Sequence, residues 1–249
     1  MKITLLALLV SVTAISGCAV SPADGRLSDG QKAASYNAEL GTNYLATGSL
    51  EQAETKLQRA LVQDPNNALA NNSNGKLLAA LDDPSSAERF FKKSIKLDGK
   101  RAEYRNNYGI FLCEQGRIDA AMTEFVTASE NKFYQTPEFA LDNAGVCAMD
   151  AGNYDLANQH LRASIRKNVN FAPPMLHMAE LKLKTGDARL ADAYYSRYMD
   201  IARQTPQSLL VGIEIRRALG DSQAVDQFAQ QLVSAYPRSQ QARTFLASQ

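Results

Sequence analysis

Turn residues recur through this chain with a nearly constant step of 34 residues, and no other feature restricts the possible folds so strongly. Each step ends on glycine or aspartate: Gly48, Asp82, Gly116, Gly152, Gly186 and Gly220. Only the step from Gly116 to Gly152 is longer, by two residues. A fixed period of this length indicates that similar supersecondary units stack and share one continuous core. Six turns in phase argue against a generic helical bundle with accidental spacing.

Small residues keep the same step as the turns. They form three series: Ala53, Ala87, Ala121, Ala157 and Ala191; Ala60, Ser94, Ala128 and Ser164; Gly41, Gly75, Gly109, Gly145 and Ala179. Small side chains let the two helices of a unit approach closely, while bulky residues fill the space between units. The bulky residues are Tyr44, Phe91, Phe125 and Tyr195. The chain is rich in alanine and leucine and has no tryptophan, which favours helix over sheet.

The order of residues within a unit resembles the tetratricopeptide repeat, a pair of antiparallel helices. The first unit carries Leu40, Gly41, Tyr44, Ala53, Leu57, Ala60 and Pro65, and the third carries Tyr108, Gly109, Ala121, Phe125 and Ala128. The resemblance implies an all-α, right-handed solenoid of six tetratricopeptide-type helix-turn-helix repeats with a C-terminal capping helix. We expect one repeat domain over 32–249, with units at about 34–67, 68–101, 102–135, 138–171, 172–205 and 206–239 and the cap at 240–249.

Residues 1–17 have the pattern of a secretory signal peptide, with a basic start, an apolar stretch and small residues before the cleavage site. The apolar stretch Ile3–Ile15 is too short to span a bilayer. The segment from Ile15 to Cys18, Ile-Ser-Gly-Cys, resembles the bacterial lipobox, which implies cleavage before Cys18 and acylation of its thiol. The alternative is an ordinary signal peptide with a cysteine near its cleavage site.

The residues that follow the lipobox predict where the mature protein is held. Residues 18–31 are rich in Ser, Pro, Gly and Asp, so we expect a lipidated N-terminus and a flexible tether there. Ala19 is not an aspartate. By resemblance to lipoprotein sorting in Gram-negative bacteria, this implies a lipid-anchored protein on the periplasmic face of the outer membrane.

Few residues of this chain are suited to catalysis or metal binding. His160 is expected to face solvent and His177 to be a packed or edge residue, and neither has a carboxylate or cysteine at ligand spacing. No Walker loop, HExxH or GxSxG pattern occurs in the sequence. Removing residues 1–17 leaves equal numbers of basic and acidic residues, which disfavours nucleic-acid binding. We therefore expect no enzyme, catalytic residue, cofactor, metal, nucleic acid or small-molecule substrate.

Two further cysteines, Cys113 and Cys147, are predicted on the first helices of adjacent units. One interpretation is a disulfide, which an oxidising compartment permits. The other is that each is a small buried hydrophobe. We expect the second, because the helical phase of Cys147 turns it toward its own unit and that of Cys113 toward the groove.

The first helices are expected to line a concave, protein-binding groove. Their phase places these residues on it: Leu45, Lys76, Ala79, Asn106, Ile110, Cys113, Phe139, Asp142, Val146, Met149, Leu176, Glu180 and Leu183. An apolar groove with scattered polar groups suits an amphipathic helix or an extended apolar segment of a partner protein. The alternative for each side chain is that it packs against a neighbouring first helix.

Three stretches of the sequence resemble one protein family. They are YRNNYGIFLCEQGRIDAAM from Tyr104, SLLVGIEIRRALGD from Ser208 and LVSAYPRSQQ from Leu232. With the lipobox and the repeats, they resemble the type IV pilus biogenesis and stability lipoproteins, the outer-membrane pilotins PilF and PilW. The resemblance implies a lipoprotein that binds type IV pilus secretin subunits, held to outer-membrane lipid through Cys18, and promotes their localisation and multimerisation. The competing interpretation is a non-pilus outer-membrane scaffold for cell-wall or barrel-assembly proteins.

Overall fold

The computed structural model describes residues 27–247, which form thirteen α-helices and no strand. The helices are α1 (Asp29–Ala46), α2 (Leu50–Gln63), α3 (Ala68–Ala80), α4 (Pro84–Leu97), α5 (Ala102–Glu114), α6 (Ile118–Ser129), α7 (Pro137–Asp150), α8 (Tyr154–Lys167), α9 (Pro173–Lys184), α10 (Ala188–Ile201), α11 (Pro206–Ala218), α12 (Ser222–Ala235) and α13 (Gln240–Ala247). None of them is long and apolar enough to cross a membrane. The predicted signal peptide and Cys18 lie outside the described residues.

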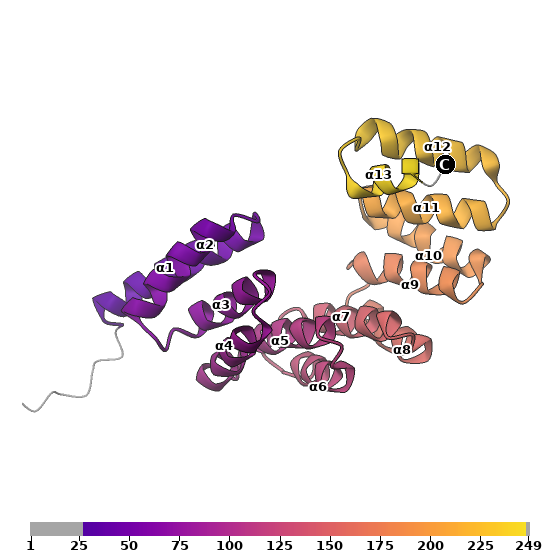
Figure 1. Cartoon of the computed structure of the whole chain (residues 1–249). Coiled ribbons are helices and arrows are strands. Elements are labelled where there is room, and N and C mark those ends of the chain that lie inside the picture. The colour runs from indigo at the N-terminus through magenta and orange to yellow at the C-terminus, as the bar shows by residue number, and fades with distance from the viewer. Residues whose placement is uncertain (1–26, 248–249) are drawn as a thin grey trace, which may run out of the picture.

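The helices pair in sequence order, and the pairs stack into a curved solenoid (Figure 1). Each first helix also contacts the first helix of the next unit, whereas the second helices pack on first helices. In the middle of the chain, α4, α6 and α8 lie on the outer side of the arc and α3, α5 and α7 on its inner side (Figure 1). Helix α13 packs on α11 and α12. The predicted all-α solenoid of six helix pairs with a C-terminal cap is confirmed.

The turn inside each unit uses left-handed backbone at the position that the period predicts. The five glycines of this series have φ between 70° and 81°: Gly48, Gly116, Gly152, Gly186 and Gly220. Asp82 occupies the sixth turn with φ 60° and is the single non-glycine residue with positive φ in the described part of the chain. Aspartate tolerates this region better than most residues, because its short polar side chain can bond locally.

The glycine series on the first helices marks where the two helices of a unit cross. A Cβ added to Gly109 would lie 2.7 Å from Cε1 of Phe125, and one added to Gly145 would lie 2.5 Å from Cγ of Leu161. Atoms at such distances overlap, so a larger residue forces the side chain or the whole second helix to move. The predicted role of these small residues in close helix packing is confirmed.

The first helix begins earlier than the predicted tether allowed. We expected the tether to extend to residue 31, but α1 begins at Asp29. The Gln31 N–H donates to Oγ of Ser28 at 3.2 Å, and the Ser28 N–H donates to Oε1 of Gln31 at 2.9 Å. These reciprocal bonds form a capping box. Ser28 and Gln31, at the end of the predicted tether, therefore cap a helix.

The longer repeat step between units three and four falls in the connection from α6 to α7. Tyr134 in this connection is 8% exposed and packs with Ala102, Ala128 and Ala140. Nδ2 of Asn131 donates to the Lys100 carbonyl at 2.9 Å, so the connection is tied to the preceding unit. The two extra residues therefore leave the stacking of the units intact.

Candidate functional site

The structure divides the eight residues of the predicted groove site into two groups. Lys76 is exposed, and four aliphatic side chains are half-buried: Leu45, Ile110, Val146 and Leu183. Asn106, Met149 and Leu176 are between 5% and 8% exposed. For these last three the expectation of an accessible groove residue is wrong, because they pack between neighbouring first helices.

A hollow of about 220 Å³ opens between α3 and α5. Its lining consists of Lys76, Ala79, Ala80, Phe91, Asn107, Ile110, Phe111 and Glu114. The two phenylalanines are at most 2% exposed, so they form its floor, while Lys76 and Glu114 are exposed. We call this space the α3–α5 hollow. It brings together three of the predicted groove residues, Lys76, Ala79 and Ile110.

The α3–α5 hollow combines an apolar floor with polar groups that can form further hydrogen bonds or ion pairs. Nδ2 of Asn107 donates to Oδ1 of Asn72. This bond leaves Oδ1 of Asn107 available as an acceptor. Within the described residues, neither Lys76 nor Glu114 takes part in an ion pair. A hollow of this composition suits an apolar side chain flanked by peptide groups.

A ladder of side-chain contacts joins successive first helices beside the groove. Its three rungs take equivalent positions in successive units and have lengths of 2.8, 2.9 and 2.8 Å: Asn107 Nδ2 to Asn72 Oδ1, Asn143 Nδ2 to Asn106 Oδ1, and His177 Nδ1 to Asp142 Oδ1. Each rung satisfies polar groups that burial would otherwise penalise. The rungs therefore hold α3, α5, α7 and α9 in register.

The third rung corrects the expectation that His177 has no carboxylate partner. Asp142 lies 35 residues away in the sequence, on the preceding unit, so spacing along one helix could not reveal it. Burial lowers the pKa of His177, but the hydrogen bond and charge of Asp142, helped by Glu180 and Asp150, raise it by more. The pKa of His177 is therefore raised above its ordinary value, and the charged rung is favoured.

His160 differs from its expected position on the solvent side of a second helix. It is 8% exposed, and this burial lowers the pKa of its imidazole. Helix α8 packs on α9 as well as on α7, which covers the face that a single helix pair would leave open.

The two cysteines of the repeat domain form a disulfide, so the expectation of two separate buried thiols is wrong. Cys113 on α5 and Cys147 on α7 have Cα atoms 5.9 Å apart. Cys147 is 2% exposed, as its helical phase predicted, while Cys113 is half-buried. Stacking of the first helices brings the two sulfur atoms together, and the phase of each helix alone does not show this contact.

The outer surface of units two and three carries a compact ionic network. Glu88 pairs with Lys92 at 2.8 Å and with Arg117 at 2.9 Å, and it accepts the Tyr108 hydroxyl hydrogen bond at 2.7 Å. The contacts from Lys92, Tyr108 and Arg117 lower the pKa of Glu88 to about 2. Sequence reasoning missed this network, because Glu88 and Lys92 belong to unit two whereas Tyr108 and Arg117 belong to unit three.

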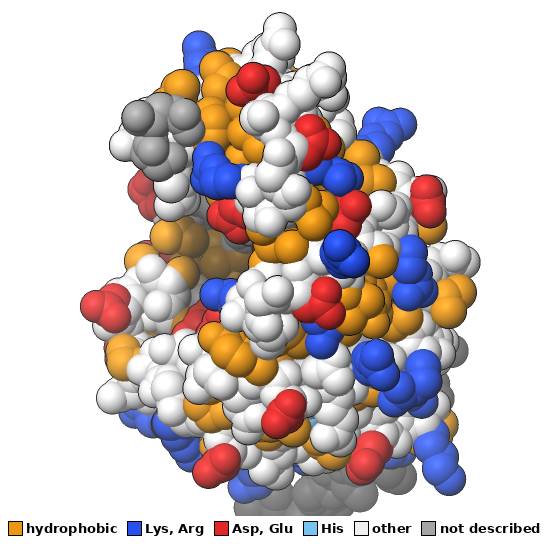
Figure 2. Space-filling view, turned by 90° about the vertical axis from the view of Figure 1, so that its right-hand side faces the viewer, with side chains coloured by type: hydrophobic (Ala, Val, Ile, Leu, Met, Phe, Trp, Pro, Cys, Tyr) orange, Lys and Arg blue, Asp and Glu red, His pale blue; other side chains and the backbone are white. Residues whose placement is uncertain are grey.

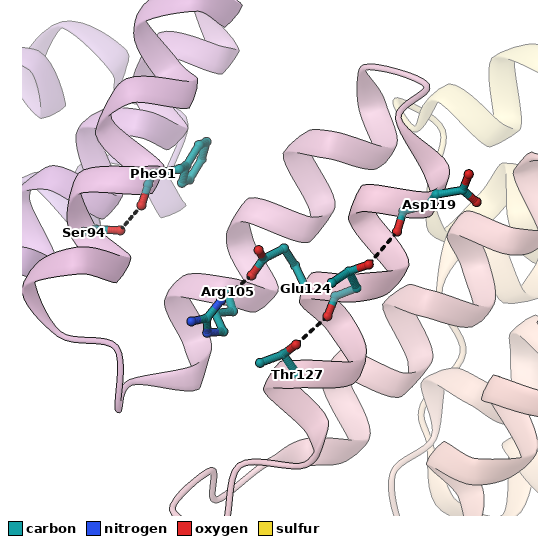
Figure 3. Close-up of polar contacts among 7 residues, drawn as sticks. Phe91, Ser94, Arg105, Asp119, Glu124 and Thr127 are labelled. Carbon is teal, nitrogen blue, oxygen red and sulfur yellow. Dashed lines mark hydrogen bonds and ion pairs between the residues drawn. The ribbon is translucent and has the colours of Figure 1, made fainter.

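Other charges on the molecule are also paired or dispersed. Arg105 and Glu124 form an ion pair of 2.9 Å between α5 and α6 (Figure 3). On the face shown in Figure 2, acidic and basic side chains are interspersed, and hydrophobic side chains line a recess at the left of the view. In the described part of the chain, no group of three or more His, Cys, Asp or Glu residues could hold a metal ion.

Comparisons with known proteins place this geometry among pilus proteins. Residues 38–102 match the tetratricopeptide repeat family model. The type IV pilus assembly protein PilF of Pseudomonas aeruginosa is 30% identical over 209 residues, which cover 84% of this chain and 83% of that protein. The crystal structure of PilW, a widely conserved type IV pilus biogenesis factor, is similar with a TM-score of 0.73 and 29% identity over 86% of this chain and 98% of that chain. The structure of Pseudomonas aeruginosa PilF gives a TM-score of 0.70 and 28% identity, over 89% of this chain and 100% of that chain.

Proposed function

Because the chain belongs to the PilF and PilW family of type IV pilus biogenesis proteins, we propose that it binds secretin subunits and promotes their multimerisation in the outer membrane. The secretin is the ring-shaped outer-membrane pore through which a type IV pilus passes. The observation that carries the proposal is the α3–α5 hollow, an accessible apolar site on the inner side of a repeat solenoid. Such a site fits an apolar segment that a secretin subunit exposes before it is assembled.

Anchoring at Cys18 is the second part of the proposal. An acylated Cys18 and a flexible tether of about ten residues would hold the first helix at a typical distance of roughly 17 Å from the membrane surface. Secretin subunits would then meet the groove where they must insert, and their effective concentration would rise without any chemical step. The lipobox resemblance of the segment ending at Cys18 supports this part.

Substitution of Ile110 tests the groove, because this half-buried residue lines the α3–α5 hollow. In a strain that lacks the wild-type protein, Ile110→Asp is expected to lower heat-stable secretin multimers on immunoblots while secretin monomers remain. The charged side chain would leave the bound apolar segment in contact with a desolvated carboxylate. Surface pili and twitching motility should decrease in parallel.

Ile95→Asp is the matched control for this experiment. Ile95 is also half-buried and packs against the same core cluster, but it lies on α4 and lines an outer hollow with Lys92 and Arg117. Circular dichroism should show equal helix content for both variants, and Ile95→Asp should retain the multimers. Normal multimer levels with Ile110→Asp would move binding to the outer face. Normal levels after deletion of the whole protein would support the non-pilus scaffold instead.

A further inference from the structure

The disulfide between Cys113 and Cys147 presents its two sulfur atoms unequally to solvent. Cys147 is 2% exposed and belongs to the core cluster that contains Phe111 and Phe125. Cys113 is half-buried and lines a hollow of about 400 Å³ where units three and four meet at their turns. The remaining lining is Glu114, Gly116, Ile118, Asp150 and Ala151. We call this space the turn hollow. A reagent from solvent can therefore approach the sulfur of Cys113, while the core covers that of Cys147.

The turn hollow is acidic. Glu114 and Asp150 are exposed, and neither takes part in an ion pair within the described residues. Arg117, the basic residue of the turn between α5 and α6, is paired with Glu88 at 2.9 Å and does not line the hollow. Two unneutralised carboxylates beside an accessible sulfur favour a positively charged reagent over a negatively charged one.

We propose that Cys113 is the sulfur through which this disulfide forms and exchanges, and that the turn hollow receives the reactive cysteine of a positively charged thiol–disulfide oxidoreductase. The proposal is independent of secretin binding. It requires only an oxidising compartment, in which structural disulfides form and persist.

The chemistry proceeds through one mixed disulfide. The Cys113 thiolate attacks one sulfur of the oxidant's disulfide, which forms a protein–oxidant S–S bond and expels the oxidant's other sulfur as a thiolate. The Cys147 thiolate then attacks Sγ of Cys113 and expels the oxidant's remaining sulfur. The two protein thiols lose two electrons and two protons in total, and the oxidant's disulfide gains both to become a dithiol. Reduction by an external dithiol is the reverse.

Burial of Cys147 slows the steps of this exchange in which its sulfur attacks or leaves. An apolar site disfavours a thiolate, so Cys147 is a poor leaving group when the disulfide is reduced and a slow nucleophile when the mixed disulfide resolves. The mixed disulfide on Cys113 should therefore live long enough to be trapped.

Mapping of small-thiol adducts tests which sulfur exchanges. The full chain carrying Cys18→Ser, which has no third cysteine, is oxidised and treated with the cationic thiol cysteamine. Acid then quenches the reaction, and N-ethylmaleimide labels the remaining thiol in the unfolded protein, in guanidinium chloride, before peptide mapping by mass spectrometry. We expect cysteamine on Cys113 and maleimide on Cys147, and the same adduct when reduced protein is treated with cystamine. Cysteamine mainly on Cys147 would overturn the proposal.

The charge preference needs a second measurement. Rates of reduction by cysteamine and by the anionic thiol 2-mercaptoethanesulfonate are compared per unit of thiolate at low salt. The cationic thiol should react roughly threefold faster or more. Combining Glu114→Gln with Asp150→Asn keeps the shape of the hollow and should bring the ratio close to one. Equal rates in the parent protein, or a ratio unchanged by the neutral variant, would overturn the positively charged partner.

Discussion

At the scale of single residues, the turns of the six units differ in one informative position. Asp82 takes the left-handed conformation that glycine occupies in the other five turns. An L-residue pays conformational strain there, which glycine avoids. The repeats therefore provide their own controls, since the same backbone is seen with and without a side chain.

Exchanging residues between two of these turns should change stability in opposite directions. Asp82→Gly should raise the free energy of unfolding by about 0.5–1 kcal/mol, because relief of strain outweighs the added freedom of the unfolded chain. Gly116→Asp should lower it by a similar amount. A Cβ at Gly116 meets no atom within 4 Å, so strain alone acts there. Urea unfolding measures both, and changes of the same sign would contradict this explanation.

Gly109 tests the helix crossing in the third unit. Gly109→Ala places a Cβ 2.7 Å from Cε1 of Phe125, and this overpacking should lower the free energy of unfolding by about 1–3 kcal/mol. Gly30→Ala is the matched control. Its Cβ would come no closer than 3.6 Å to any atom outside its two chain neighbours and the backbone of its own helix. It should be neutral or slightly stabilising, since alanine favours helix. An unchanged melting temperature for Gly109→Ala would show that the core adapts freely.

At the scale of helices, two different kinds of bond join the first helices of units three to five. The disulfide closes a separation of 34 residues between α5 and α7, which is worth about 3–4 kcal/mol by the chain-entropy estimate. The Asp142–His177 rung joins α7 to α9 and depends on pH. The first kind of bond responds to redox conditions and the second to protonation.

Replacing His177 should reveal the pH dependence of this rung. The pKa of His177 is raised in the folded state, so its stabilisation is complete below about pH 6.5 and is lost as pH rises through the folded pKa. His177→Gln can still donate to Asp142 but carries no charge. The difference in unfolding free energy between the two proteins should be largest near pH 5.5 and shrink toward pH 8. The lowered pKa of His160 has the opposite effect on stability as pH changes, but it is present in both the wild type and the His177→Gln variant. A difference that does not vary with pH would contradict a charged rung.

At the scale of the whole molecule, a curved stack of helix pairs carries the α3–α5 hollow on its inner side, and its proposed anchor precedes the first helix. In a solenoid each unit contacts only its neighbours, so the stack gives an extended surface without a central cavity. The α3–α5 hollow lies in the second and third units and shares no residue with the proposed anchor at Cys18. Binding and anchoring should therefore be separable by mutation.

Cys18→Ser tests this separation. The variant should fold with unchanged helix content and lose the acyl chains that mass spectrometry is expected to find on wild-type Cys18. Secretin multimers should decrease because the local concentration falls, and overproduction of the unlipidated protein should restore them partly. Wild-type protein with an unmodified Cys18 in its native host would rule out the anchor.

Contacts within a unit could be predicted from the sequence, because one unit is short and its two helices follow each other directly. The 34-residue step located all six left-handed turns, Asp82 included, and the glycines of the helix crossings. The helical phase also placed Lys76, Ala79 and Ile110 on the groove, and all three line the α3–α5 hollow. Local sequence and period thus determined the fold and part of the candidate site.

Contacts between units were decided only by the tertiary structure. The partners of Cys113 and His177 lie 34 and 35 residues away, and the burial of Met149 and Leu176 comes from neighbouring first helices. These contacts depend on the rotation and shift of one unit against the next, which sum many weak packing terms across the interface. A period records that units repeat but contains no measure of that rotation. For this physical reason the sequence determined the units, and the stacking of the units determined which side chains meet and which remain accessible.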